Sequence, residues 1–333
     1  MLKPTSTDYI SILRQLFREY QKACPEPKRR GRPYTYAQES LVVFFAVMTL
    51  KHNYQAKAQR RWLQEHPDQR QALGMDTVPS RWTLARRWKK LYPTVKAFVA
   101  WVGDWAEDLD EAFRGKDCFE DKSLFKALGP VWHQKDRKAG RIPKGLRNLD
   151  LEATWSKSKY QGWVYGYGGH WTTTLAGFPK AVEVETACVS ESEVIDRKAE
   201  AFWEAGIHTL TADNAYCNLV RVRRWAEHGV VLITPASRLS PDSPQGGPYK
   251  AFVARPENAT LLKARRTATE PLFDFIAKLI GAGDQQKQLP VQGLARVRTC
   301  LALGTLLAQL AMIVNSIWGM PLHSISHMMA VLT

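Results

Sequence analysis

Three acidic residues lie in sequence contexts from which they could bind a metal ion. Asp121 ends the run KDCFED, Asp213 follows the strand-like run IHTLTA, and Glu270 lies inside the long helical pattern RRTATEPLFDF. Hard divalent cations prefer oxygen ligands, and two ions about 4 Å apart can activate an attacking oxygen and stabilise the leaving oxygen of a phosphodiester. We therefore expect the three carboxylates to meet at one edge of a sheet and to bind magnesium.

The same residues also have ordinary structural interpretations. Asp213 could cap the helical segment at 217–228, a role that is compatible with metal binding. Asp150, in RNLDLEATW, also follows a short strand-like run and is the alternative first carboxylate to Asp121. Glu270 could be an exposed helix residue in a salt bridge with Arg266 at i−4.

Composition indicates a folded protein with an anionic partner. The 333 residues are 45% hydrophobic, and 47 Lys and Arg against 32 Asp and Glu give a formal charge of +15. A field of that sign favours nucleic acid first and an anionic membrane second. The five cysteines are scattered without close pairs, so neither a zinc site nor a disulfide framework is indicated. Without a recognisable export signal, the expected location is the cytoplasm, in association with the nucleoid.

One apolar stretch is long enough to raise the question of a membrane. Residues 300–314 read CLALGTLLAQLAMIV, and the apolar character continues to Trp318. Gln309 and Asn315 interrupt the stretch, and Arg296 and Arg298 precede it. We therefore expect a buried core helix and no membrane partner.

Residues 1–115 are rich in helix formers and tryptophan, with apolar residues at helical spacing, and are expected to form an all-helical DNA-binding domain. Between its first two helices lies PEPKRRGRPY, a Pro and Gly segment that cannot continue a helix. Its cations are candidates for contacts with phosphates or a narrow minor groove, and a solvated linker is the alternative. They are Lys28, Arg29, Arg30 and Arg32.

The segment VPSRWTLARRWKKL predicts a basic helix with Ser80 as its N-cap. A short helical segment around residues 55–73 precedes it, an order that resembles a helix-turn-helix whose last helix enters the major groove. Arg81, Arg86 and Arg87 would then contact DNA. An amphipathic helix with a charged outer face explains the same pattern.

After residue 115 strands and helices alternate. KDCFED, GWVYGYGGHWTTTL with AVEVETACV, IHTLTAD and VVLITPA read as a strand, a hairpin and two further strands, with helices at SEVIDRKAEAFWEAG and LVRVRRWAEHG. Strand, hairpin, helix, strand, helix, strand is the ribonuclease H order. It predicts an α/β fold with a mixed five-stranded sheet flanked by helices, in which Asp121 leaves the first strand and Asp213 leaves the fourth beside it. The catalytic domain is expected at 116–290, and residues 291–333 form a C-terminal helical segment packed on it.

Over nearly its whole length the chain resembles the DDE transposases of bacterial insertion sequences. The resemblance runs through DKSLFKALGPVWHQKDRKAGRIP, LDLEATWSKSKYQGWVYGYGGHW, TADNAY, RRTATEPLFDF and the apolar helix after GLARVR. It implies an RNase H-like catalytic domain with two Mg²⁺ ions, replaceable by Mn²⁺, held by Asp121, Asp213 and Glu270. It also implies an N-terminal domain that binds the terminal inverted repeats of the element.

Members of that family carry a signature around the glutamate, which this chain matches in part. Arg266 stands four residues before Glu270, as in the family, whereas Lys263 replaces the expected tyrosine and Lys278 lies one position beyond the expected lysine. The resemblance implies that Arg266, Lys263 and Lys278 contact DNA.

The resulting expectation is an enzyme that cleaves the ends of an insertion sequence and transfers the 3′-hydroxyl ends into target DNA, as a homodimer on double-stranded DNA. Two alternatives stay open: a catalytically retired relative kept as a DNA-binding or regulatory protein, and a host nuclease on the same fold.

Overall fold

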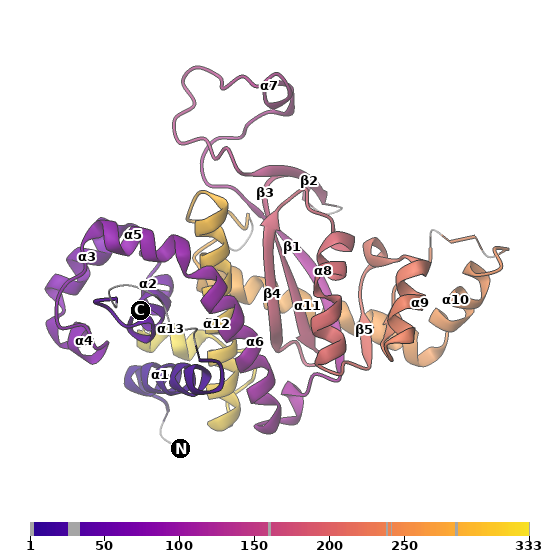
Figure 1. Ribbon diagram of the computed structural model, residues 1–333, viewed down its shortest axis with the longest axis horizontal. Coiled ribbons are helices and arrows are strands. Elements are labelled where there is room, and N and C mark those ends of the chain that lie inside the picture. The colour runs from indigo at the N-terminus through magenta and orange to yellow at the C-terminus, as the bar shows by residue number, and fades with distance from the viewer. Residues whose placement is uncertain are drawn as a thin grey trace.

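The structure is a computed structural model that describes residues 3–25, 34–158, 161–237, 239–240, 242–283 and 286–332. A group of helices precedes a mixed sheet, and long helices that follow the sheet in the chain pack against both (Figure 1). The structure confirms an α/β protein that begins with a helical region.

The N-terminal region is helical because its apolar residues recur at helical spacing and its helix starts are capped. The Thr5 hydroxyl and the Asp8 carboxylate form a reciprocal capping box at the start of α1. Ser80 is the N-cap of α5, as predicted, and its Oγ accepts the amide of Thr83 at 3.1 Å. The helices are α1 (Ser6–Ala23), α2 (Gln38–Leu50), α3 (Ala56–Glu65), α4 (Pro67–Ala72), α5 (Arg81–Lys90) and α6 (Tyr92–Trp105), followed by the 3-10 turns η1 (Ala106–Asp108) and η2 (Glu111–Phe113).

The sheet is mixed, with an antiparallel part and a parallel part. Strand β3 pairs antiparallel with β1 along one edge and with β2 and β4 along the other, whereas β5 and β6 continue parallel from β1. The strands are β1 (Asp117–Lys126), β2 (Thr154–Ser158), β3 (Gly162–Thr174), β4 (Pro179–Thr186), β5 (Thr209–Thr211) and β6 (Val231–Ile233). The connections of the parallel part run through α8 (Glu191–Glu204) and through η3 (Asn214–Tyr216) with α9 (Leu219–Glu227). This is the predicted hairpin followed by parallel strands with helical crossovers.

Three local expectations are wrong. Strand β1 does not end at Asp121 but runs to Lys126, because the 13-residue β3 offers it partners from Thr174 to Gly166. The Pro-, Ser- and Gly-rich composition of residues 237–258 predicts a loop after β6, but this segment contains α10 (Gly246–Val253), whose Tyr249 packs into the protein and donates a hydrogen bond to the Leu232 carbonyl. Two short elements were not expected, β2 and α7 (Gln134–Lys138).

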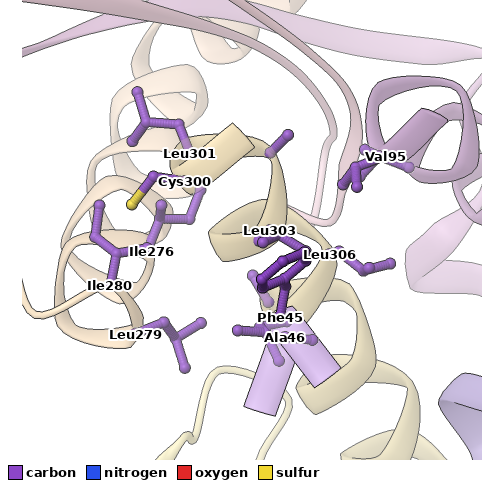
Figure 2. Packing of buried hydrophobic residues seen from close by; sticks show 14 of the residues in the cluster. Phe45, Ala46, Val95, Ile276, Leu279, Ile280, Cys300, Leu301, Leu303 and Leu306 are labelled. Atoms are coloured by element: carbon purple, nitrogen blue, oxygen red, sulfur yellow. The ribbon is translucent and has the colours of Figure 1, made fainter. Parts of the chain in front are cut away.

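Helix α12 (Leu294–Ile317) is the centre of the hydrophobic core. It packs against α2, α5 and α6 on one side and against α11 (Pro256–Leu279) and the sheet on the other. Figure 2 shows its Cys300, Leu301, Leu303 and Leu306 between side chains of α2, α6 and α11. The helix is long and apolar enough to cross a membrane, but 89% of its apolar window is buried inside the protein, so the structure agrees with a core helix. The last helix is α13 (Ser326–Leu332).

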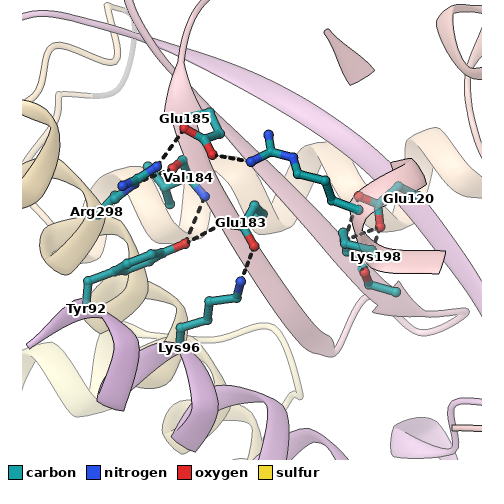
Figure 3. Close-up of polar contacts among 10 residues, drawn as sticks. Tyr92, Lys96, Glu120, Glu183, Val184, Glu185, Lys198 and Arg298 are labelled. Carbon is teal, nitrogen blue, oxygen red and sulfur yellow. Dashed lines mark hydrogen bonds and ion pairs between the residues drawn. The ribbon is translucent and has the colours of Figure 1, made fainter. Parts of the chain in front are cut away.

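Polar contacts join the N-terminal helices and α12 to strand β4 (Figure 3). Lys96 of α6 forms an ion pair with Glu183, and the Tyr92 hydroxyl donates to the same carboxylate at 3.1 Å. Arg298 of α12 pairs with Glu185 at 2.7 Å. The helical region is therefore held to the sheet by charges as well as by the shared core.

Candidate metal centre on the sheet

Asp121 lies on β1, beside Asp213, which follows the end of the neighbouring parallel strand β5. Phe119 of β1 is level with Thr211 of β5. Asp121 is two residues beyond Phe119 and Asp213 is two residues beyond Thr211, so continuing the register places the two carboxylates on the same face of the sheet. Their electrostatic coupling agrees with this placement, because the charge of Asp213 raises the pKa of Asp121.

Helix α11 covers Asp121 with two polar side chains. The Arg265 guanidinium forms an ion pair with Asp121 Oδ2, and the Thr269 hydroxyl donates to the same oxygen at 2.8 Å. Burial raises the pKa of Asp121 to about 6, against the opposing effects of Arg265 and Thr269. The carboxyl group is therefore poised to gain or lose a proton near neutral pH.

Asp213 is half-buried and closes the end of β5. Its Oδ1 accepts the amide of Ala215 at 2.8 Å, which caps the turn η3. A carboxylate has further lone pairs after one such bond, so the capping role leaves Asp213 able to bind a cation.

Glu270 is turned to a different side of α11. Thr269 is fully buried against Asp121, and the next residue on a helix points about 100° away from its neighbour. The Glu270 side chain is 56% exposed and pairs with Arg266 at 3.1 Å. It lines a groove of about 970 Å³ together with Lys263, Arg266, Lys278 and His323. The structure thus brings Asp121 and Asp213 together and leaves Glu270 outside the pair.

The two paired carboxylates fit one hard divalent cation. Mg²⁺ commonly takes one or two protein carboxylates and fills its other positions with water and substrate phosphate. Asp121 and Asp213 supply those carboxylates, whereas the Arg265 cation competes for Asp121. Across the residues that the structure describes, no three His, Cys, Asp or Glu side chains are grouped so that they could hold a metal. A second ion would need Glu270 in another orientation.

Asp150, the alternative first carboxylate, has a structural role. It is buried, accepts the Tyr167 hydroxyl at 2.9 Å, and accepts the amide of Gly293 at 2.9 Å. Gly293 is the N-cap of α12, so Asp150 fixes the start of the central core helix.

The predicted DNA contacts fall on two separate surfaces. Arg81 borders a groove of about 690 Å³ between α3 and the start of α5. Arg87 lies 3.9 Å over the ring of Tyr34, and Arg86 is exposed on the same helix. Lys263, Arg266 and Lys278 line the groove beside Glu270. Arg29, Arg30 and Arg32 lie outside the described residues.

Sequence reasoning did not anticipate Arg265 and Thr269. The sequence carries a signal for them, because helical spacing places them on one side of the helix with Leu272 and Ile276. The structure shows that all four residues are buried. Sequence reasoning also missed the cations Lys57, Arg60 and Arg61, which share the groove with Arg81.

Comparison with known proteins finds no matching family model, no matching curated protein and no matching solved structure. The function has to be inferred from the residues of the chain and their geometry.

Proposed function

We propose that the protein is a metal-dependent enzyme that cuts DNA and transfers the cut strand, as DDE transposases do, on an RNase H-like catalytic domain. The observation that carries the proposal is the position of Asp121, on β1, beside Asp213, just beyond the end of the adjacent parallel strand β5. Asp213 thus lies at the carboxyl end of a parallel strand, where ligand sites of open α/β sheets occur, and Asp121 lies next to it in the middle of β1.

The order of the strands supports the same proposal. The antiparallel strands β1, β3 and β4, followed by the parallel strands β5 and β6 through helical crossovers, form the arrangement expected of an RNase H-like domain, to which the short strand β2 is added beside β3. The central β1 carries Asp121. Helix α11 contacts this carboxylate through Thr269, the residue that precedes Glu270 in the chain. The charge of +15 suits a nucleic-acid substrate.

In this proposal Asp121 and Asp213 hold Mg²⁺ or Mn²⁺. When bound there, such an ion would supply activation of a water molecule for attack on the phosphodiester and charge stabilisation of the leaving oxygen. Asp121 can serve as a ligand only when it is ionised, which its pKa of about 6 allows at neutral pH. Thr269 orients the Asp121 carboxylate, and Arg265 balances its charge while no cation is bound.

The DNA partners follow from the chemistry. The released 3′-hydroxyl would attack target DNA at the same carboxylates, without a covalent protein intermediate. Because the two ends of an element must be joined to one target, we infer a homodimer on double-stranded DNA. The basic groove between α3 and α5 is the candidate surface for the terminal repeats.

One observation favours a second function, that of a retired relative that binds DNA without cutting it. Arg265 already neutralises Asp121, and Glu270 is paired with Arg266 away from the carboxylates. A protein whose third ligand never joins the other two would bind DNA only.

A cleavage assay separates the two functions. The substrate is a supercoiled plasmid that carries the gene with its flanking DNA, incubated with full-length protein and Mg²⁺. We expect nicked or linear plasmid from the wild type and none from Asp213→Ala or Glu270→Gln. Asp274→Asn is the matched control, because Asp274 lies one turn from Glu270 in the same groove and is 59% exposed. Cleavage that survives Asp213→Ala contradicts the proposal, and a wild type that binds the plasmid without cutting it favours the second function.

A further inference from the structure

A loop between β1 and β2 stands away from the rest of the molecule. Residues 129–149, here called the basic arm, leave the sheet at the end of β1, carry the short helix α7, and return toward β2 (Figure 1). The arm is large enough to be a contact surface of its own.

The base of the arm is tied to the fold. The Gln292 side-chain amide donates to the Leu128 carbonyl at 2.8 Å and also to the Asn148 carbonyl, so it holds the two ends of the arm together. The Trp155 indole donates to the Trp132 carbonyl at 2.8 Å, and the Trp132 indole donates across the arm to the Arg141 carbonyl at 2.9 Å. These bonds give the arm a defined shape at its base.

The arm is strongly basic. Residues 133–148 read HQKDRKAGRIPKGLRN, in which six Lys and Arg accompany a single carboxylate, Asp136. Asp136 pairs with Arg141 at 3.4 Å, and Arg137 lies 5.9 Å over the Trp132 ring. Within the part of the chain that the structure describes, the other four cations have no ion-pair partner and are exposed: Lys135, Lys138, Lys144 and Arg147.

Such a cluster of cations is destabilising unless an anion binds it, because the like charges repel one another. A solvated protein surface normally intersperses both signs. The phosphates of duplex DNA offer one negative charge per about 1.7 Å along the helix axis, which a row of Lys and Arg can neutralise with release of counterions. Charge complementarity therefore selects the DNA backbone as the partner.

The position of the arm fixes where on the DNA it would act. Strand β1 continues for five residues beyond Asp121, to Lys126, and a strand rises about 3.3 Å per residue, so the strand alone separates the carboxylate pair from the arm by about 17 Å. That separation corresponds to about five base pairs at about 3.4 Å per pair.

We propose that the basic arm binds the phosphate backbone of duplex DNA about five or more base pairs from the phosphodiester held at Asp121. The distance from the cut rests on the proposed function, whereas binding by the arm does not. Lys135, Lys138, Lys144 and Arg147 make the contacts, and the ties at Trp132 and Gln292 hold them in place.

The test measures affinity of the full chain for a random-sequence duplex in EDTA at several NaCl concentrations. The arm variant carries Lys135→Gln, Lys138→Gln, Lys144→Gln and Arg147→Gln. Its matched control removes four cations from α9, α10 and the residues that follow them, with Arg223→Gln, Arg224→Gln, Lys250→Gln and Arg255→Gln. We expect the slope of log K against log[salt] to become less negative by about 3 to 4 in the arm variant and to change little in the control. Affinity at low salt should fall about a hundredfold.

The proposal is overturned if the slope of log K against log[salt] in the arm variant equals that of the wild type. It is also overturned if the control variant loses as much of this slope as the arm variant does. A double variant, Lys135→Gln with Lys144→Gln, should lose about half of that slope and guards against misfolding of the fourfold variant. EDTA prevents metal-dependent cutting, so the affinity measurement tests the arm alone. If the wild type binds DNA through the arm in EDTA but does not cleave the plasmid with Mg²⁺, only the proposed function is contradicted. A wild type that cleaves, with an arm variant of unaltered slope, contradicts only the arm. With cleaved DNA, a hydroxyl-radical footprint about five or more base pairs from the cut should disappear in the arm variant.

Discussion

At the scale of single residues, the ion pair of Arg265 with Asp121 decides how strongly the site can bind a cation. The guanidinium places a positive charge against the carboxylate that a metal would need. In a partly buried site, charges a few ångströms apart interact by several kcal/mol. Removing the guanidinium should therefore favour a bound cation.

We expect Arg265→Gln to bind Mn²⁺ at least about tenfold more tightly than the wild type at pH 8, without DNA. Electron paramagnetic resonance of free Mn²⁺ measures this directly. Arg266→Gln is the matched control, because its partner Glu270 lies outside the carboxylate pair. Equal Mn²⁺ affinity in wild type and Arg265→Gln would show that the guanidinium does not compete for Asp121.

Two buried groups should give opposite pH dependences of stability. Burial raises the pKa of Asp121 from 3.8 to about 6, so over this range the folded protein holds a proton that the unfolded chain has lost, and stability falls as pH rises. Burial lowers the pKa of His170 from 6.5 to about 2, helped by the charges of Lys122, Lys198 and Arg197. Over that range the unfolded chain holds the extra proton, and stability rises with pH.

Between about pH 4 and about pH 6 the stability contributed by Asp121 falls as pH rises, whereas the stability contributed by His170 increases. Relative to the wild type, His170→Gln should therefore lose stability as pH rises through this window, by up to about 3 kcal/mol for two pH units. Asp121→Asn should gain stability relative to the wild type over the same window. Chemical denaturation across the pH range gives both difference curves, and a flat curve for Asp121→Asn would mean that the Asp121 pKa is not raised.

At the scale of elements, the orientation of α11 about its own axis keeps Glu270 away from Asp121 and Asp213. One side of the helix packs on the sheet through Phe273, whose ring lies 5.2 Å from that of Trp171. That contact directs Thr269 toward Asp121 and leaves Glu270 in the groove. The rotation of one helix therefore determines whether a third ligand joins the pair.

Close backbone contacts hold the helices to the sheet. Gly103 of α6 lies so close to β4 that an added Cβ would stand 2.7 Å from the Lys180 carbonyl oxygen. We expect Gly103→Ala to lower the free energy of unfolding by about 1 to 3 kcal/mol, despite the better helix propensity of alanine.

The comparison variant for this prediction is Gly304→Ala on α12. Its Cβ would meet Ile280 Cγ2 at 2.6 Å and Ile276 Cγ2 at 3.1 Å. These atoms are side-chain methyl groups, whereas the Lys180 carbonyl oxygen is backbone held by the sheet, so Gly304→Ala should cost less. Urea denaturation measures both, and a Gly103→Ala protein as stable as the wild type would show that α6 can move away from β4.

The elements that the sequence predicts well are those with a local pattern. The β3–β4 hairpin, α8, α11 and α12 follow from alternation or helical spacing, and the carboxylates of Asp121 and Asp213 could be predicted to adjoin. The continuation of β1 beyond Asp121 depends on its long partner β3, and the side to which Glu270 turns depends on the packing of Phe273. Both depend on residues distant in the chain, which local periodicity does not reveal.

At the scale of the whole molecule, the N-terminal helices and the sheet share one core. A single cluster of buried hydrophobic residues runs from Tyr9 in α1 to Leu332 in α13 and includes side chains of β1, β3 and β4. The Gln309 amide of α12 donates to the Val99 carbonyl of α6 at 2.9 Å and to the Pro179 carbonyl of β4 at 2.7 Å. The helical region therefore cannot leave the sheet without exposing α12.

We expect the full chain to unfold in one calorimetric transition, because both parts bury the same helix and the unfolding of either part exposes it. The measurement is scanning calorimetry of the wild type beside a fragment of residues 116–333. The fragment would expose the α12 side chains that now face α2 and α6, so it should melt at a lower temperature than the full chain or fail to give a cooperative transition. Two separated transitions in the full chain, with a fragment as stable as the second of them, would instead mean that the helical region folds independently and that α12 belongs to the sheet alone.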